Sequence, residues 1–251
     1  LGILVTHAPT ESNWGGVAEG TIAMMLTMLK QARERDRHLK TGGPWRDAGI
    51  QGTYVGSRAD GYPGITIGLI GLGRIGGRIA NLMRPWQARI IACDPYIPDS
   101  RFEEHDVRRV DLPTLLGEGD VVSLHVVLTR ETRHLIGGPQ FARMRPTAYF
   151  VNVARGPIVD EAALIDALRA GRIGGAALDV FEQEPVAADN PLLAMDHVIV
   201  TPHSLCWTDE CFHNMASTGL ASIVDALTGR RPEFVVNPEV LVHPRVRVRQ
   251  E

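Results

Sequence analysis

Cysteine is scarce in this sequence of 251 residues, whose three cysteines, Cys93, Cys206 and Cys211, show no CxxC spacing. An odd and sparse set of thiols favours reduced side chains inside a cell over a disulfide framework. A secretory signal is also not visible, although the sequence starts at Leu1 rather than at methionine. These features favour a cytoplasmic protein, and no bound metal is expected.

An excess of one charge and long apolar runs are missing as well. Lysine and arginine number 26 against 29 aspartates and glutamates, so the charge does not indicate a nucleic acid or an acidic membrane as a partner. The best apolar stretches, Ile22–Leu29 and Ile65–Leu72, are too short to cross a bilayer. With 44% apolar and 22% charged residues, the composition is that of a globular protein with room for two modest domains.

Helical and β-branched segments alternate along most of the sequence. Apolar residues recur at helical spacing from Ala18 to Leu29, and an irregular stretch rich in glycine and proline follows from Thr41 to Gly64. The expected strands are Ile65–Ile70, Arg89–Cys93, Asp120–His125, Ala148–Val153, Ala176–Val180 and His197–Val200. The expected later helices are Arg74–Arg84, Leu112–Leu116, Pro139–Met144, Glu161–Ala170 and Thr208–Leu227. Strands separated by helices of this length form βαβ units, so the sequence predicts a parallel sheet with right-handed crossovers.

Gly71, Gly73 and Gly76 form a GxGxxG motif that directly follows the first of these strands and opens a helix. In this setting the first glycine permits a tight turn, the second lets the backbone approach a pyrophosphate, and the third lets helix and strand close together. The phosphate is then held by N–H groups at the helix N-terminus. The alternative is a tight turn without a ligand. We expect a Rossmann-type α/β fold, a doubly wound parallel sheet that binds a dinucleotide.

Asp94 follows the second strand, 18 residues after Gly76, where a dinucleotide site places the carboxylate that accepts hydrogen bonds from the ribose hydroxyls. A carboxylate there repels a 2′-phosphate, so NAD is favoured over NADP. Two alternatives remain open, namely that Asp94 is a turn residue before Pro95, or that downstream arginines reach a phosphate. These arginines are Arg101, Arg108 and Arg109.

Three ionisable residues follow later strands at their carboxyl ends, the edge where open α/β sheets bind their ligands. They are Arg155, Glu184 and His203. Taken singly, an arginine or a glutamate in a loop is usually a solvated charge, and a lone histidine is more often structural than catalytic. Together with the glycine turn they form a more specific set.

The sequence resembles the D-isomer-specific 2-hydroxyacid dehydrogenases in several ordered segments. The matching segments are GLIGLGRIG, HVVLTRETRHLI, NVARGPIVDEAAL, GGAALDVFEQEP and TPH, and the start VTHAPTESNWGGVAEG is also similar. The resemblance implies hydride transfer between NAD and a small 2-hydroxy or 2-keto acid. It also implies that Arg155 holds the substrate carboxylate and polarises the carbonyl, and that His203 supplies the proton.

The same resemblance implies further site residues. Glu184, rather than Glu182, pairs with the histidine and fixes its ring. Asp179 lies near the nicotinamide. The other residues implied along the cofactor crevice are Arg74, Ile75, Val126, Thr132, Val153 and Ala154.

A domain organisation and a partner chain are implied as well. Residues 11–206 correspond to the NAD-binding domain, and residues 1–10 and 207–251 to a partial remnant of a second, substrate domain whose N-terminal part is absent. Because the family is commonly dimeric through its NAD-binding domain, a homodimer with the segment Glu11–Gly64 as its arm is expected. The sequence departs from the family pattern at Val127, where proline is frequent, and at Ser204–Trp207, where small residues are common.

Other functions stay open at the level of sequence. One is an NAD(H)-binding regulatory protein without turnover, similar to the co-repressors built on this fold, and another is an inactive fragment. Oxidation of phosphite on a similar scaffold is a third. Formate is a weaker candidate, because the related formate enzymes carry glutamine at the position of Glu184. The identity of the 2-hydroxy acid cannot be read from the sequence.

Overall fold

The computed structural model describes residues 2–248, and the chain divides into two compact units. The larger unit is Val17–Leu205, and the smaller one combines Leu1–Gly16 with Cys206–Glu251. Leu1 and residues 249–251 of the expected substrate-domain remnant lie outside the described residues. The division falls a few residues from the expected boundaries at 11 and 206, and the assignment of the smaller unit to a substrate domain stays a prediction.

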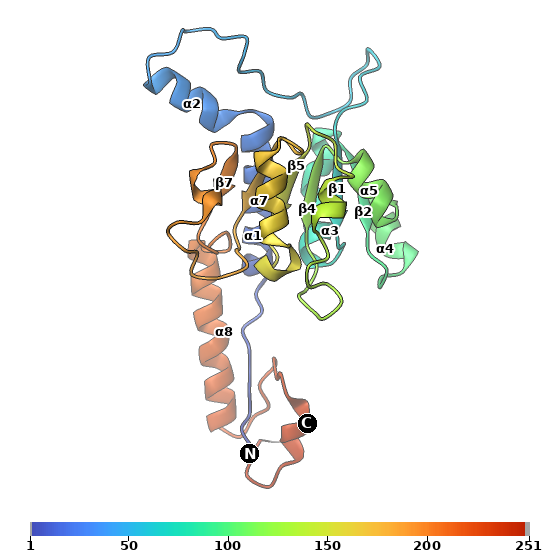
Figure 1. Ribbon diagram of the computed structural model, residues 1–251. Coiled ribbons are helices and arrows are strands. Elements are labelled where there is room, and N and C mark those ends of the chain that lie inside the picture. The colour runs from blue at the N-terminus through green and yellow to red at the C-terminus, as the bar shows by residue number, and fades with distance from the viewer. Residues whose placement is uncertain (1, 249–251) are drawn as a thin grey trace. The chain divides into compact units, whose positions relative to one another are not determined.

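A seven-stranded parallel sheet forms the centre of the larger unit (Figure 1). Its strands are β1 (Thr66–Ile70), β2 (Arg89–Cys93), β3 (Arg108–Arg109), β4 (Val121–Leu124), β5 (Tyr149–Asn152), β6 (Gly175–Leu178) and β7 (Val198–Val200). The strand order is β3-β2-β1-β4-β5-β6-β7, so the winding direction reverses between β1 and β4. A reversal of this kind opens a crevice at the carboxyl ends of the two strands. The predicted doubly wound α/β fold is confirmed.

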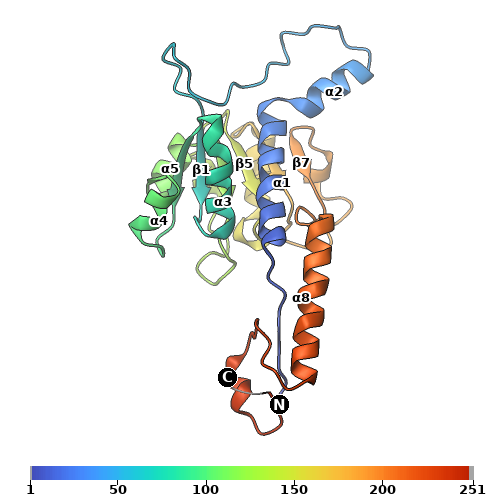
Figure 2. The same ribbon diagram turned by 180° about the vertical axis from the view of Figure 1, so that it is seen from behind.

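Helices cover both faces of this sheet. The helices of the chain are α1 (Glu11–Leu29), α2 (Ala32–Lys40), α3 (Arg74–Met83), α4 (Asp99–Glu104), α5 (Leu112–Glu118), α6 (Gly138–Phe141), α7 (Glu161–Arg169) and α8 (Asp209–Leu227). Short 3-10 turns are η1 (Arg84–Trp86), η2 (Gly156–Ile158), η3 (Pro191–Ala194) and η4 (Pro238–Val242). Helices α5 and α7 lie on the face seen in Figure 1, and α1 and α3 on the opposite face seen in Figure 2.

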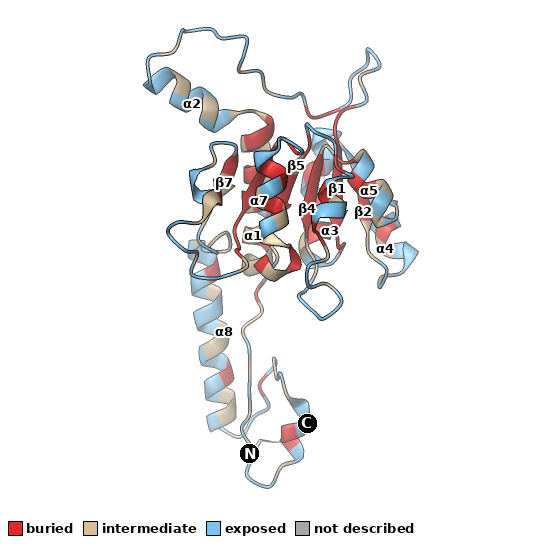
Figure 3. Ribbon diagram, in the orientation of Figure 1, coloured by how far each residue is buried: buried red, intermediate tan, exposed pale blue. Residues whose placement is uncertain are grey.

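Each face of the sheet has its own apolar core. One core joins residues of α5, α6 and α7 to the strands, and the other joins residues of α1, α3 and α4. Every residue of β1 is buried, as expected for a central parallel strand covered on both faces (Figure 3). Ile67 and Leu69 are fully buried, and a side chain in that position contributes roughly 1.5–3 kcal/mol through the hydrophobic effect.

Three elements were not expected from the sequence, namely α2, α4 and β3. Helix α2 has no buried residue, and its sequence shows no apolar stripe. Gln31, in a left-handed conformation with φ of 50°, separates α2 from α1. Strand β3 consists of Arg108 and Arg109 only, and both are exposed. Polar elements of this kind carry no hydrophobic periodicity, which is the main signal in a sequence.

The smaller unit contains α8 and the segments that lead to and from it. The helix begins after Thr208, whose hydroxyl accepts a hydrogen bond from the N–H of Cys211 at 3.1 Å. Near the two ends of the unit, Thr6 and Val235 form an antiparallel bridge. Within residues 2–248, the structure contains no helix that is both long enough and apolar enough to span a membrane.

Candidate active site and cofactor crevice

The glycine turn between β1 and α3 is shaped by close backbone contacts. Gly71 has a φ of 96°, and a Cβ atom there would lie 2.7 Å from the carbonyl oxygen of His125. A Cβ atom at Gly76 would lie 2.3 Å from the carbonyl oxygen of Gly71. Any side chain at either position would therefore push the turn away from β4 or from α3. Only glycine fits this conformation and these distances.

The N-terminus of α3 is open at Gly73. This residue is the N-cap of the ten-residue helix, no side chain caps the helix there, and nothing lies within 4 Å of the position a Cβ atom would take. The first helical N–H groups are the donors that bind phosphate in dinucleotide sites, and the helix dipole adds to that attraction. Arg74 and Ile75 are the first two residues of the helix. The turn therefore fits a pyrophosphate.

A cavity of about 860 Å³ lies beside the glycine turn, and its lining is mostly apolar. Four of the predicted cofactor residues line it, and they are Gly73, Asp94, Val126 and Thr132. Val127, where the family pattern often has proline, also lines the cavity and is exposed. The predicted residues outside this lining are Gly71, Arg74, Ile75, Gly76, Val153, Ala154 and Asp179. The cavity has the size and the apolar walls that suit part of a nucleotide cofactor.

Asp94 is fixed by two backbone hydrogen bonds. Its Oδ2 accepts from the N–H of Leu72 in the glycine turn at 3.0 Å, and its Oδ1 accepts from the N–H of Tyr96 at 3.0 Å. Each carboxylate oxygen has a second acceptor position, so these bonds orient the group without using all of its capacity. Asp94 is thus a turn residue, as one of the sequence alternatives proposed, and it is also a hydrogen-bond acceptor that lines the cavity.

His125 was missed as a candidate site residue in the sequence, although it directly follows β4 at the same sheet edge. Both of its ring nitrogens are buried, and neither has a hydrogen-bond partner among the described residues. Burial lowers its pKa from 6.5 to about 3, so the imidazole is neutral at physiological pH. It lines the same cavity as Asp94. A buried polar ring without a partner next to a cavity is consistent with a site for a polar ligand.

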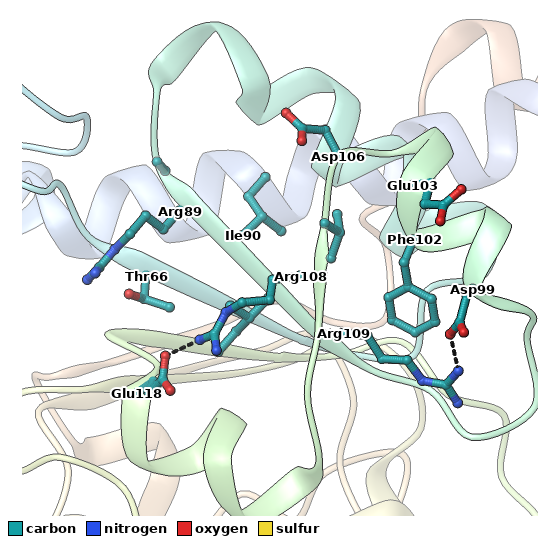
Figure 4. Close-up of a pocket in the computed structure, with 13 residues that line it drawn as sticks. Thr66, Arg89, Ile90, Asp99, Phe102, Glu103, Asp106, Arg108, Arg109 and Glu118 are labelled. Atoms are coloured by element: carbon teal, nitrogen blue, oxygen red, sulfur yellow. Dashed lines mark hydrogen bonds and ion pairs between the residues drawn. The ribbon is translucent and has the colours of Figure 1, made fainter.

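The three downstream arginines, which could have reached a phosphate, form ion pairs with carboxylates instead. Arg101 pairs with Glu104 at 2.5 Å, Arg108 pairs with Glu118, and Arg109 pairs with Asp99. Figure 4 shows the last two pairs in a second cavity, of about 850 Å³, beside the edge strand β3. None of the predicted site residues lines that second cavity.

Glu184 and His203 form a hydrogen-bonded ion pair at the carboxyl edge of the sheet, with 2.8 Å between Oε2 and Nδ1. The other oxygen of Glu184 accepts from the N–H of Phe181 at 3.0 Å. Partial burial raises the pKa of the Glu184 carboxyl, but the hydrogen bonds from His203 and Phe181 and the positive charges of His203 and Arg155 outweigh burial, so the pKa lies below its usual value. Glu182, the alternative partner, pairs with His134 instead, at 2.6 Å.

Arg155 is close enough to Glu184 for its charge to act on that carboxylate. The guanidinium is exposed, and its Nη1 donates to the carbonyl of Ala154 at 2.6 Å. The turn that carries it is shaped by the buried side chain of Asn152, whose amide donates to the carbonyl of Arg155 and accepts from the N–H of Ala154, both at 3.1 Å. The structure therefore pairs Glu184 with His203 and places Arg155 within range of the Glu184 charge.

Asp179 is buried beneath the loop that carries His203. Its carboxylate accepts hydrogen bonds from the Thr201 hydroxyl at 2.5 Å and from the N–H groups of Ser204 at 2.9 Å and Leu205 at 3.3 Å. His203 itself has a left-handed conformation with φ of 55°. These bonds hold that loop in place, a contribution of Asp179 that the sequence did not indicate.

The fold and the glycine turn define a dinucleotide-binding α/β protein, and comparison with known proteins defines its family. Residues 22–204 match the family model of the D-isomer specific 2-hydroxyacid dehydrogenase NAD binding domain. A glyoxylate reductase of Thermofilum pendens is 39% identical, with 99% of this chain and 72% of that protein covered. A D-3-phosphoglycerate dehydrogenase of Archaeoglobus fulgidus is also 39% identical, with 94% of this chain but only 43% of that protein covered.

Solved structures give the same result. The structure of D-lactate dehydrogenase with NAD⁺ from Lactobacillus jensenii superimposes with a TM-score of 0.82 at 31% identity, covering 93% of this chain and 72% of that one. A D-lactate dehydrogenase from Aquifex aeolicus complexed with NAD and lactic acid has a TM-score of 0.80 at 31% identity, covering 90% of this chain and 70% of that one. The chain belongs to the D-isomer specific 2-hydroxyacid dehydrogenases, an oxidoreductase family, and it contains their NAD-binding domain.

Proposed function

We propose that this protein transfers hydride between the nicotinamide of NAD and a small D-2-hydroxy acid or its 2-keto form, with Arg155, Glu184 and His203 as its catalytic residues. The observation that carries the proposal is the 2.8 Å pair between Glu184 and His203 with Arg155 beside it, at the sheet edge where the glycine turn lies. Bound NAD supplies or accepts the hydride, and the protein positions and polarises the substrate.

Arg155 binds the substrate. Its guanidinium presents a planar fork of N–H donors that matches a carboxylate, and the same group can polarise the neighbouring carbonyl oxygen. The side chain is exposed, and its hydrogen bond to the carbonyl of Ala154 leaves further donors for a ligand.

His203 moves the proton. Because Nδ1 faces Glu184, Nε2 is the ring atom that remains for the substrate oxygen. Reduction of the keto acid places negative charge on that oxygen, and proton donation from Nε2 neutralises it. Glu184 holds the ring in this orientation and stabilises its positive form.

Cofactor binding involves the residues around the glycine turn and the cavity beside it. We propose that the pyrophosphate is held at Gly73, Arg74 and Ile75, that Asp94 accepts hydrogen bonds from the ribose hydroxyls, and that NAD is preferred over NADP. The ion pairs of Arg101, Arg108 and Arg109 support this preference, although Arg130 lines the same cavity as Asp94. The remaining proposed cofactor residues are Gly71, Gly76, Val126, Thr132, Val153, Ala154 and Asp179.

Small keto acids are the substrates to test, since the similar proteins have names that refer to glyoxylate, hydroxypyruvate and lactate. The experiment measures oxidation of NADH with glyoxylate, hydroxypyruvate and pyruvate. We expect His203→Ala to lower kcat by about 10²–10⁴-fold, the usual contribution of general acid catalysis, with NADH affinity retained. The matched control is His213→Ala at an exposed position of α8. Unchanged turnover in His203→Ala would contradict the assigned mechanism.

We further propose that the protein is a cytoplasmic homodimer. The segment from Thr41 to Gly64 is largely exposed and includes Trp45 at 82% and Tyr54 at 54% exposure, which suits a surface that contacts a second copy. Light scattering of the purified protein should give twice the mass of the chain. A monomer at micromolar concentration would contradict the dimer.

A further inference from the structure

A second imidazole–carboxylate pair is formed by Glu182, two residues before Glu184 in the chain, and His134. Nε2 of His134 and Oε1 of Glu182 are 2.6 Å apart. Both side chains are partly exposed. The pair joins the loop after β4, which carries His134, to the turn after β6, which carries Glu182 and Glu184.

Glu182 also ties its turn to the start of α7. Its Oε2 accepts from the N–H of Glu161 at 3.3 Å, and its own N–H donates to Oε2 of Glu161 at 2.8 Å. Oε1 of Glu161 in turn accepts from the side-chain amide of Asn190 at 2.7 Å. Both carboxylate oxygens of Glu182 therefore have partners, on two different elements.

The turn held by Glu182 is in direct contact with the turn that carries Arg155. A Cβ atom at Gly156 would lie 1.7 Å from the carbonyl oxygen of Phe181 and 2.4 Å from the nitrogen of Glu182. Phe181 also donates its N–H to Glu184 at 3.0 Å. A shift of the 181–182 backbone would therefore move both the Glu184 carboxylate and the neighbouring Arg155 turn.

His134 is fixed on the other side of the pair. It has a left-handed conformation with φ of 51°, and its N–H donates to the carbonyl of Pro157, in the η2 turn next to Gly156. The following residue, Leu135, lines the cofactor cavity together with Thr132. Through its backbone N–H and its imidazole, His134 thus connects the cavity loop with the η2 turn and with the Glu182 turn.

We propose that Glu182 and His134 are positioning residues that keep Glu184, and through it His203, in the correct position relative to Arg155. This inference rests on the proposed function, because it assigns these two residues to the same reaction. Neither residue is proposed to touch the substrate or the cofactor. Partners of this kind fix the groups that do, and their loss misplaces the catalytic groups without removing them.

The test compares Glu182→Ala, His134→Ala and the double variant by kcat, KM and NADH affinity. We expect each single variant to lower kcat about 10–100-fold, the loss that removal of hydrogen-bond partners causes at metal sites, while the dissociation constant for NADH changes less than about threefold. The double variant should lose no more than the stronger single variant, because the two residues act as one unit.

Two further variants separate positioning from a general loss of structure. Glu182→Gln keeps one acceptor for the N–H of Glu161 and one donor for a neutral His134 ring, so it should recover most of the activity that Glu182→Ala loses. Glu118→Ala removes a partly exposed glutamate that pairs with Arg108 in the distant cavity of Figure 4, and it should leave kcat unchanged. Equal kcat in Glu182→Ala and wild type, or no recovery in Glu182→Gln, would overturn the inference.

A readout without turnover distinguishes this inference from the proposed function. The ring nitrogen chemical shifts of His203 report its hydrogen bond to Glu184, and we expect Glu182→Ala, but not Glu118→Ala, to change them. If the wild-type protein shows no turnover on any 2-keto acid, the proposed function fails, while a changed His203 signal still supports the positioning. An unchanged His203 signal overturns the positioning whether or not the wild type turns over.

Discussion

At the scale of single residues, hydrogen-bond donors fix the orientation of each carboxylate at the carboxyl edge of the sheet. Asp94 accepts from Leu72 and Tyr96, and Asp179 accepts from the loop of His203. Glu184 accepts from His203 and Phe181. Acceptors with such fixed donors are oriented before a ligand arrives, which lowers the entropic cost of binding.

A first prediction concerns the choice between NAD and NADP. Replacing Asp94 by serine removes the negative charge that repels a 2′-phosphate and leaves Arg130 lining the same cavity. We expect the ratio of kcat/KM for NADPH over NADH to rise at least about tenfold, which corresponds to ~1.4 kcal/mol. The control is Asp36→Ser, which removes an exposed carboxylate paired with Lys40 within α2. A ratio that does not move would show that Asp94 does not select the cofactor.

At the scale of elements, the site depends on how closely neighbouring turns approach one another. The turn after β5 carries Arg155, and the turn after β6 carries Glu184. Gly156 allows the two backbones to touch, since any Cβ atom there would overlap the carbonyl group of Phe181. The turns that carry Arg155 and Glu184 can therefore touch because residue 156, in the turn after β5, is a glycine.

Gly156→Ala should consequently disturb both turns. The new methyl group would overlap backbone atoms, and overpacking of this kind typically destabilises a protein by about 1–3 kcal/mol. Gly117→Ala is the matched control, because Gly117 lies in α5 and nothing is within 4 Å of the position its Cβ would take. Thermal unfolding should show a lower Tm for Gly156→Ala and an equal or higher Tm for Gly117→Ala. Equal Tm values for Gly156→Ala and wild type would contradict the close approach.

At the scale of the whole molecule, the covered sheet buries polar groups along with its apolar cores. His125, whose two ring nitrogens are buried, follows β4 at the winding reversal between β1 and β4. Its pKa of about 3 in the folded protein lies below the 6.5 of an unperturbed histidine. Between these values the unfolded chain binds a proton that the folded chain does not, so stability falls as the pH is lowered.

The size of this pH effect can be predicted. His125 should contribute a loss of about 2 kcal/mol in the free energy of unfolding between pH 7 and pH 5, and His125→Gln should not show that loss. Urea unfolding at the two pH values measures it, with His213→Gln on the exposed side of α8 as the control. An equal pH dependence for His125→Gln and wild type would show that His125 is not buried in its neutral form.

The sequence by itself determined the class of fold and the dinucleotide turn. Alternation of apolar strands with amphipathic helices predicts a parallel sheet, and a turn such as that of Gly71 and Gly76 admits no other residue type. Both are local patterns, so they can be read without coordinates. Elements without apolar periodicity, such as α2 and β3, could not be found in this way.

Only the tertiary structure decided which side chains meet. Two glutamates and two histidines make several pairings conceivable, and the structure pairs Glu184 with His203 and Glu182 with His134. It also pairs Arg108 and Arg109 with carboxylates beside the edge strand β3, and it buries the ring nitrogens of His125 without a partner among the described residues. Such contacts join loops that follow different strands, and their distances depend on how the strands and helices pack, which no local pattern in the chain encodes.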